Sequence, residues 1–149
     1  MHSKKFKYQE YTEQLFNCPP DTYKEIDTRA FRWVFPECDA NSFKPVLLIN
    51  PTRKFDNDDE KCSGYALSMF EKEEGAYKKY KKFVSNKPDL KNTFGTQIAE
   101  LQLTMNLGVA EPESKGYTHF NFHEYKECDL SKKIIKIIEI FDENGDFTR

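Results

Sequence analysis

Apolar and polar side chains alternate between residues 97 and 105. The apolar set is Ala99, Leu101, Leu103 and Met105, and polar residues lie between its members. A period of two predicts a β-strand with one face on a core and the other in water. Similar alternation with many aromatic residues predicts further strands over residues 28–35, 63–70 and 117–125.

Two other stretches repeat their apolar side chains every three or four residues, which predicts amphipathic helices. The first covers residues 5–16 and ends before Cys18-Pro19-Pro20, where the two prolines stop it. The second covers residues 71–84. It has glutamates in its first turn and lysines further along, as the helix dipole favours.

Three shorter stretches complete the predicted fold. Residues 45–49 form an apolar strand candidate, and residues 53–61 form a charged, mobile loop. Residues 132–141 fit helical spacing as well as a strand, but their many isoleucines favour the strand. The chain therefore predicts one α+β domain over residues 1–149. It would contain a mixed or mostly antiparallel sheet of about five or six strands and two main helices.

Composition limits the partners of such a domain. Of the 149 residues, 38% are hydrophobic and 15% are aromatic, which is enough for a core built on large rings. Lysine and arginine number 23 against 25 acidic residues, so no overall positive field attracts nucleic acid or anionic membranes. Nucleic-acid binding by the lysines of residues 78–82 is disfavoured, because the tyrosines of that helix would face the core. The longest apolar run, residues 134–141, is too short to span a bilayer.

The four cysteines, Cys18, Cys38, Cys62 and Cys128, form no Cys-x-x-Cys pair. The first residues lead into no apolar signal segment, so we expect a cytoplasmic protein in a reducing compartment. Idle or buried thiols are then favoured, and a disulfide between two of the four is the alternative.

Metal-binding and nucleophilic motifs give weak signals. His119 and His123 precede Cys128, which resembles a zinc spacing. On a strand, residues four apart lie about 13 Å from each other, so the two histidines cannot share one ion, and we predict no metal site. The acidic stretch 56–60 lacks the glycine of an EF-hand loop. The sequence also contains no glycine-rich phosphate loop and no Gly-x-Ser-x-Gly elbow.

An arginine in the first predicted strand, Arg32 or Arg29, combines with a second feature further along the chain. Residues 62–80 read CSGYALSMFEKEEGAYKKY. They contain a small residue pair, an aromatic strand, a serine, and then a helix with an alanine before an aromatic-rich turn. This combination resembles the second-strand region of ADP-ribosyltransferase-like domains.

The resemblance implies an NAD-consuming protein that transfers ADP-ribose to an unknown macromolecule or hydrolyses NAD. Arg32 would hold the NAD phosphates or ribose. Ser63 and Tyr65 would line the nicotinamide pocket. From its place on the polar face of its strand, close in sequence to Glu124, His119 is a further candidate for contact with the substrate ribose. NAD is then a substrate, and no further cofactor is required.

Physical chemistry suits these roles. Arginine offers a bidentate fork to pyrophosphate, tyrosine stacks on nicotinamide, and a carboxylate stabilises the cationic charge that develops at the ribose carbon. The candidate catalytic residues are Arg32 and Glu124, with Glu100 as the alternative carboxylate. Neither glutamate belongs to the Glu/Gln-x-Glu pair that marks many active members of the family.

A non-catalytic protein-interaction module is the alternative hypothesis. In that case an exposed aromatic face around Trp33, Tyr117 and Tyr125 would dock a protein partner. The sequence identifies neither the partner nor the oligomeric state. Nicotinamide release from NAD would favour the enzyme, and a stable complex in solution would favour the module.

Overall fold

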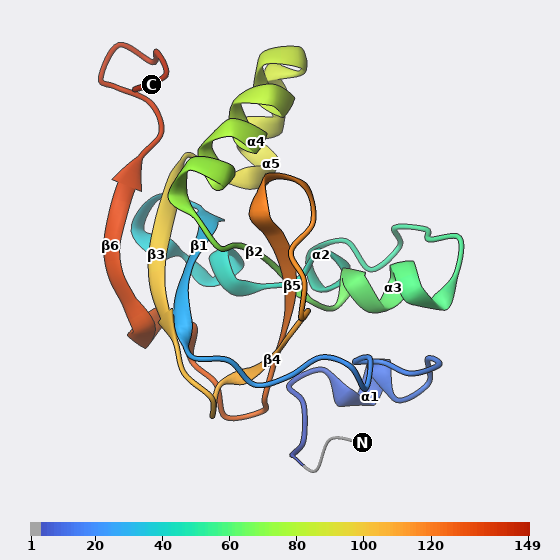
Figure 1. Cartoon of the computed structure of the whole chain (residues 1–149). Coiled ribbons are helices and arrows are strands. Elements are labelled where there is room, and N and C mark those ends of the chain that lie inside the picture. Colours follow the sequence, from blue (N-terminus) through green and yellow to red (C-terminus); the bar gives the residue numbers. More distant parts are fainter. Residues whose placement is uncertain (1–3) are drawn as a thin grey trace.

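The computed structural model describes residues 4–149, which fold around one six-stranded antiparallel sheet with the strand order β4-β5-β2-β1-β3-β6 (Figure 1). The strands are β1 Thr28–Val34, β2 Leu67–Phe70, β3 Gln97–Leu103, β4 Gly108–Ala110, β5 His119–Glu124 and β6 Ile134–Glu139. The predicted α+β class and the number of strands are confirmed.

One helix in this fold is long, and the others are short. They are α1 Gln9–Thr12, α2 Val46–Ile49, α3 Asp58–Gly64, α4 Glu73–Asn86 and α5 Lys91–Phe94. Single 3₁₀ turns add η1 Pro36–Cys38, η2 Ala40–Phe43, η3 Pro88–Leu90, η4 Gly116–Thr118 and η5 Leu130–Lys133. The helix predicted over residues 71–84 is confirmed as α4, whereas the one predicted over residues 5–16 is limited to the single turn α1.

Alternation along the central strands sends side chains to two different cores. Ala30 and Val34 of β1 join a hydrophobic cluster on one face, to which all six strands contribute. We call this face the inner face. Phe31 and Trp33, which lie between them, pack on the other face beneath α4. Because Arg32 has the same parity as Ala30 and Val34, it belongs to the inner face.

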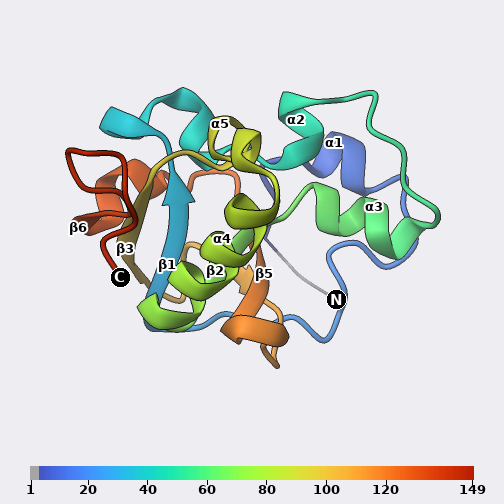
Figure 2. The same ribbon diagram turned by 90° about the horizontal axis from the view of Figure 1, so that it is seen from above.

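Helix α4 covers the opposite face, which we call the α4 face, over β1, β2 and β3 (Figure 2). Its buried side includes Tyr77, Tyr80 and Val84, as the helical spacing predicts. Gly75 is required near its first turn, because a Cβ there would lie 2.0 Å from the carbonyl oxygen of Tyr117 in η4. Glycine is a weak helix former, but at this position it allows η4 to pack closely on α4.

Three predictions between residues 45 and 70 are wrong in part. The apolar run 45–49 is the helix α2, with Pro45 at its N-cap, because four apolar residues fit one helical turn as well as a strand. The acidic part of the expected loop is the first turn of α3, where the side chain of Asn57 accepts a hydrogen bond from Glu60 N. The strand expected over residues 63–70 is limited to β2, because α3 continues to Gly64.

The remaining strand predictions agree with the structure. The strand predicted over residues 117–125 corresponds to β5, and the strand predicted over residues 132–141 corresponds to β6. The short strand β4 has only three residues and was not predicted. Within residues 4–149 no helix has both the length and the apolar character needed to cross a membrane.

Candidate functional site

An open cleft of about 660 Å³ lies beside β1 and β2, between these strands and the connection that follows β1. The walls come from the end of β1, the segment from Phe35 to Arg53, the residues around β2, and α5. Most of this lining belongs to short helices and turns held against the sheet. A concave site with mixed polar and apolar walls is the usual form of a small-molecule pocket.

Positive charge predominates in the cleft although the chain as a whole is slightly acidic. Arg32, Lys44 and Arg53 contribute three cations to the lining, and Asp39 contributes its single carboxylate. Asp39 is already engaged, because its Oδ1 accepts hydrogen bonds from Asn41 N at 2.9 Å and from the Ser42 hydroxyl at 3.5 Å. The cleft therefore attracts anions locally.

Arg32 is the best-fixed of the three cations. Its Nε donates to the carbonyl of Ser42 at 2.8 Å, and its Nη1 donates to the carbonyl of Ser68 at 2.9 Å. These bonds use two of the five N–H groups of a guanidinium. No carboxylate of residues 4–149 forms an ion pair with Arg32. Burial lowers the pKa of Arg32 to about 10, against an opposing attraction to Glu124, so the group is charged at neutral pH.

Aromatic rings also line the cleft. Trp33, Phe35 and Phe94 line the cleft, and the rings of Trp33 and Phe94 lie 4.6 Å apart between centroids. The indole N–H of Trp33 donates to the carbonyl of Ala76 at 2.9 Å, which fixes the ring against α4. Such rings offer flat apolar surface to a ligand, and Asn41, Asn50 and Asn92 add amide groups.

Of the residues predicted from the sequence, the structure brings Arg32 and Ser63 together in this cleft. Ser63 lies in the last turn of α3, where its hydroxyl donates to the carbonyl of Asp59 at 3.2 Å and accepts from Asn121 Nδ2 at 3.2 Å. Tyr65 lies outside the lining and stacks on Tyr11, with centroids 5.5 Å apart and planes 5° apart.

Glu124, the predicted catalytic carboxylate, also lies outside the cleft lining. It ends β5 on the inner face with 3% of its surface exposed, and its Oε2 accepts a hydrogen bond from Lys7 Nζ at 2.7 Å. Its Oε1 has no hydrogen-bond partner among the described residues. Burial raises the pKa of Glu124, and the contacts with Lys7 oppose this shift. The carboxylate thus belongs to a buried ionic cluster.

The alternative carboxylate and the predicted histidine have other surroundings. Glu100 on β3 forms an ion pair with Arg29 on β1, which lies diagonally across the ladder and directly opposite Gln102, so the two charges neutralise each other. His119 packs edge-on against Phe70 on the α4 face, with ring centroids 5.5 Å apart. Burial, with a smaller contribution from Lys79, lowers the pKa of His119 to about 4, so this imidazole is neutral at pH 7.

The aromatic face of the alternative hypothesis is divided in the structure. Trp33 packs into the core beneath α4, and Tyr125 lies in a separate cluster with Phe6, where 7% of its surface is exposed. Tyr117 in η4 is 39% exposed. The three side chains do not share one exposed patch.

The cysteines give one correction. Cys18 and Cys62 are joined by a disulfide across 44 positions of sequence, whereas Cys38 and Cys128 are free. The expectation of idle thiols is therefore wrong for the first pair. The bond links the segment after α1 to α3, and these two helices lie together to one side of the sheet (Figures 1 and 2).

Most residues that line the cleft could not be identified from the sequence. Lys44, Arg53 and Asn92 come from segments with no hydrophobic period, and only the tertiary contacts of these segments bring them to Arg32. Comparisons with protein-family models, with curated proteins and with solved structures found no match for this chain.

Proposed function

We propose that this domain binds an anionic small molecule that carries a flat ring, the class that includes nucleotides and NAD, in the cleft beside β1 and β2. The observation that supports this most directly is the state of Arg32. Two backbone carbonyls fix its guanidinium, and no carboxylate of the described chain neutralises it through an ion pair. A fixed cation of this kind is pre-organised for a phosphate or carboxylate group.

The other walls suit the second part of such a ligand. Trp33 and Phe94 supply rings on which a base or nicotinamide ring can stack, and Lys44 and Arg53 supply further positive charge. Amide groups such as that of Asn92 both donate and accept, which is what the polar edge of a heterocycle needs. The volume of about 660 Å³ lies within the range of small-molecule sites.

We propose recognition rather than ADP-ribosyl transfer as the activity of this cleft. Transfer needs a carboxylate beside the ribose carbon, where positive charge develops. Within the described residues Asp39 is the carboxylate of the lining, and it is bonded to the turn that follows it. Glu124 is paired with Lys7. NAD is the first ligand to test, because the resemblance to ADP-ribosyltransferase-like domains implies it.

The chain offers its own probe for this test. Trp33 is the single tryptophan and lines the cleft, so a bound ring should change its fluorescence. We would titrate the protein with NAD, AMP and the uncharged nucleoside adenosine, and measure nicotinamide release in the NAD sample. We expect saturable binding of the phosphorylated ligands, weaker binding of adenosine, and no release.

Two arginines of one strand provide a matched pair of variants. Arg32→Gln should weaken binding of the anionic ligands about tenfold or more, because a charge-assisted contact contributes about 1.5–3 kcal/mol. Arg29→Gln removes the same charge from the same strand outside the cleft, so it should bind as the wild type does. Equal loss in both variants, or no binding of any phosphorylated ligand, contradicts the proposal and favours the protein-interaction module. Nicotinamide release would restore the transferase hypothesis.

A further inference from the structure

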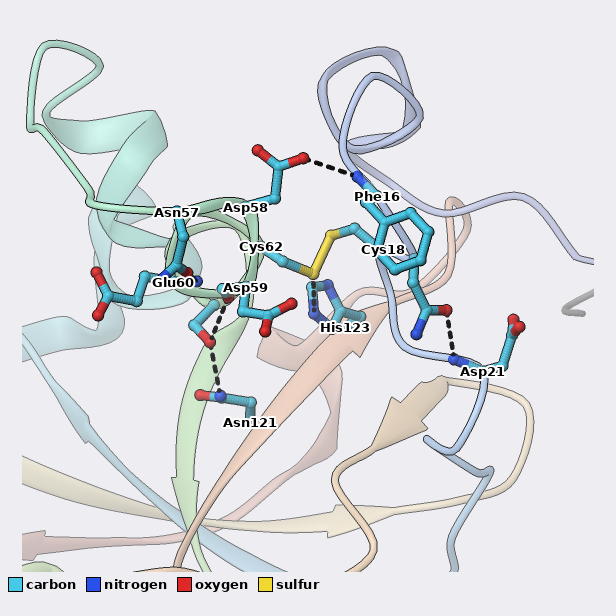
Figure 3. The surroundings of a disulfide bond; sticks show 12 residues. Phe16, Cys18, Asp21, Asn57, Asp58, Asp59, Glu60, Cys62, Asn121 and His123 are labelled. Atoms are coloured by element: carbon cyan, nitrogen blue, oxygen red, sulfur yellow. Dashed lines mark hydrogen bonds between the residues drawn. A yellow bond between two sulfur atoms is a disulfide. The ribbon is translucent and has the colours of Figure 1, made fainter.

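The disulfide between Cys18 and Cys62 lies against a buried histidine (Figure 3). Sγ of Cys62 is 3.7 Å from Nε2 of His123, and these two residues are 3% and 4% exposed. Figure 3 shows the imidazole of His123 directed at the sulfur pair. A histidine beside two cysteines is a metal-ligand set whenever the sulfurs are not bonded to each other.

The spacing of the three ligand atoms fits one metal ion. Both sulfurs and one ring nitrogen of His123 lie within 4.8 Å of one another. Tetrahedral zinc, with Zn–S bonds of about 2.3 Å and Zn–N bonds of about 2.0 Å, holds its ligand atoms roughly 3.5–3.8 Å apart. The Cys62–His123 distance of 3.7 Å already matches this value. Once the sulfur–sulfur bond is broken, rotation of the Cys18 side chain would place its Sγ at a similar distance from the other two ligand atoms.

Other contacts keep the two cysteine segments together without the disulfide. The backbone N–H of Phe16 donates to Oδ2 of Asp58 in α3 at 3.0 Å. Tyr11 in α1 stacks on Tyr65, the C-cap residue of α3. His123 is held independently, because β5 pairs with β4 on one side and β2 on the other. The ligands would thus stay close when the sulfur–sulfur bond is broken.

We propose that the reduced protein binds one zinc ion through the thiolates of Cys18 and Cys62 and Nε2 of His123, so that this site alternates between a disulfide and a metal centre. Two thiolates and an imidazole are ligands that zinc favours over magnesium or calcium. With three protein ligands, the fourth tetrahedral position is filled by water or an external ligand.

The chemistry of the exchange balances with a dithiol as the reductant. The dithiol transfers two electrons and two protons to the protein disulfide, which gives two cysteine thiols and the cyclic disulfide of the reductant. Zinc then binds both sulfurs and displaces their two protons to solvent. In the reverse step a low-molecular-weight disulfide accepts two electrons from the metal-bound thiolates and two protons from solvent and becomes two thiols, while the Cys18–Cys62 bond forms again and the ion is released.

The test compares the oxidised and reduced forms of the whole 149-residue chain. Reduction uses a phosphine, which takes the oxygen of one water molecule, becomes a phosphine oxide and does not compete strongly for the metal. Cobalt(II) is added as a spectroscopic substitute for zinc, and bound zinc is measured separately by elemental analysis after dialysis. We expect a sulfur-to-cobalt charge-transfer band and one zinc per chain in the reduced sample, and neither in the oxidised one.

Variants separate the site from the fold. His123→Gln keeps both cysteines, so it should still form the disulfide in the oxidised state. It should bind zinc about tenfold or more weakly after reduction, because it lacks one of three ligands. Cys38→Ser and Cys128→Ser remove the two free thiols and should keep the cobalt band. Circular dichroism of each reduced variant shows whether it remains folded.

Each outcome decides for or against the site. The proposal is supported if zinc raises the unfolding temperature of the reduced wild type, as a ligand of the native state must, and does so less for His123→Gln. A reduced wild type without the band or without bound zinc overturns it. Full zinc affinity in folded His123→Gln, or loss of the band in Cys38→Ser or Cys128→Ser, also overturns it.

Discussion

The two faces of the sheet bury their polar groups in different ways. On the α4 face the groups are neutral and satisfied: the Tyr80 hydroxyl donates to the carbonyl of Gly95 at 2.6 Å, and the Trp33 indole donates to the carbonyl of Ala76 at 2.9 Å. On the inner face the groups are charged. Arg32 has carbonyl partners without an ion pair, and one oxygen of the Glu124 carboxylate lacks a partner among the described residues.

This difference indicates a division of roles. Satisfied aromatic groups combine large apolar area with hydrogen bonding, and they add stability without a penalty for buried charge. Buried charges cost free energy of folding unless they are fully paired. The proposed ligand site would explain why Arg32 is kept beside a cleft despite this cost. We expect mutations on the α4 face to unfold the protein and mutations of the inner-face charges to change its chemistry.

The largest effect is expected from Tyr80→Ala. The side chain is fully buried and contacts the rings of Trp33, Phe94 and Phe141. Its loss should lower the free energy of unfolding by about 3–5 kcal/mol in urea titrations, because a ring-sized cavity forms beneath α4.

Two variants control this measurement. Tyr80→Phe keeps the ring and loses only the hydrogen bond to Gly95, so it should cost about 1 kcal/mol. Phe16→Ala removes a ring that is 78% exposed and should change the free energy of unfolding by less than about 0.5 kcal/mol. A loss for Tyr80→Ala no greater than that for Phe16→Ala would show that the α4 face is not the stabilising one.

The length of each helix or strand explains whether the sequence could predict it. Strand β3 and helix α4 repeat their patterns over 7 and 14 residues, so each pattern is long enough to exclude the other period. Helix α2 has four apolar residues, which fit either structure. Short elements take their conformation from what they pack against, and this information is not local.

The candidate site depends even more on such distant contacts. Arg32 and Ser63 were predicted because each lies in a recognisable strand or small-residue motif. Lys44 and Arg53 reach the cleft only through the packing of the segment that follows β1. Nothing in the spacing of the four cysteines singles out Cys18 and Cys62, which are 44 positions apart. Local periodicity predicts elements, but it does not predict which loops meet.

The second effect concerns Glu124 and pH. Burial raises its pKa in the folded protein above the ordinary value of 4.5. Below pH 4.5 both states hold the proton. As the pH rises from there through the raised pKa, the unfolded chain loses this proton more readily than the folded one, so stability falls. Relative to Glu124→Gln, the wild type should therefore lose stability as the pH rises from 4.5 through the raised pKa of Glu124, with a slope of at most about 1.4 kcal/mol per pH unit.

Lys7 sharpens this prediction. Its ammonium group opposes the rise in the Glu124 pKa, so Lys7→Met should extend the stability loss to higher pH. Chemical unfolding of the wild type, Glu124→Gln and Lys7→Met at several pH values makes the comparison. Parallel curves for the wild type and Glu124→Gln would mean that this carboxyl titrates alike in both states, and the contrast between the two faces would weaken.

A smaller change in stability than that of Tyr80→Ala is expected from Arg32→Met, which is also the variant that best separates the two roles. Methionine keeps much of the apolar stem and removes the buried charge and its two hydrogen bonds. Water in the open cleft can satisfy the carbonyls of Ser42 and Ser68, and the cost of burying a cation disappears. These terms oppose each other, so the free energy of unfolding should change by less than about 1 kcal/mol. Nucleotide binding, measured by Trp33 fluorescence, should be lost.

A different result would change the role of Arg32. If Arg32→Met destabilises the protein by more than about 2 kcal/mol, the carbonyl bonds serve mainly to fasten the segment around Ser42 to the sheet, because broken buried hydrogen bonds cost that much. The variant Arg32→Lys then separates charge from geometry, because lysine keeps the positive charge but lacks the forked N–H groups of the guanidinium. A lysine that restores stability but not nucleotide binding would locate the function in the planar geometry of the guanidinium, because only that geometry engages two phosphate oxygens at once.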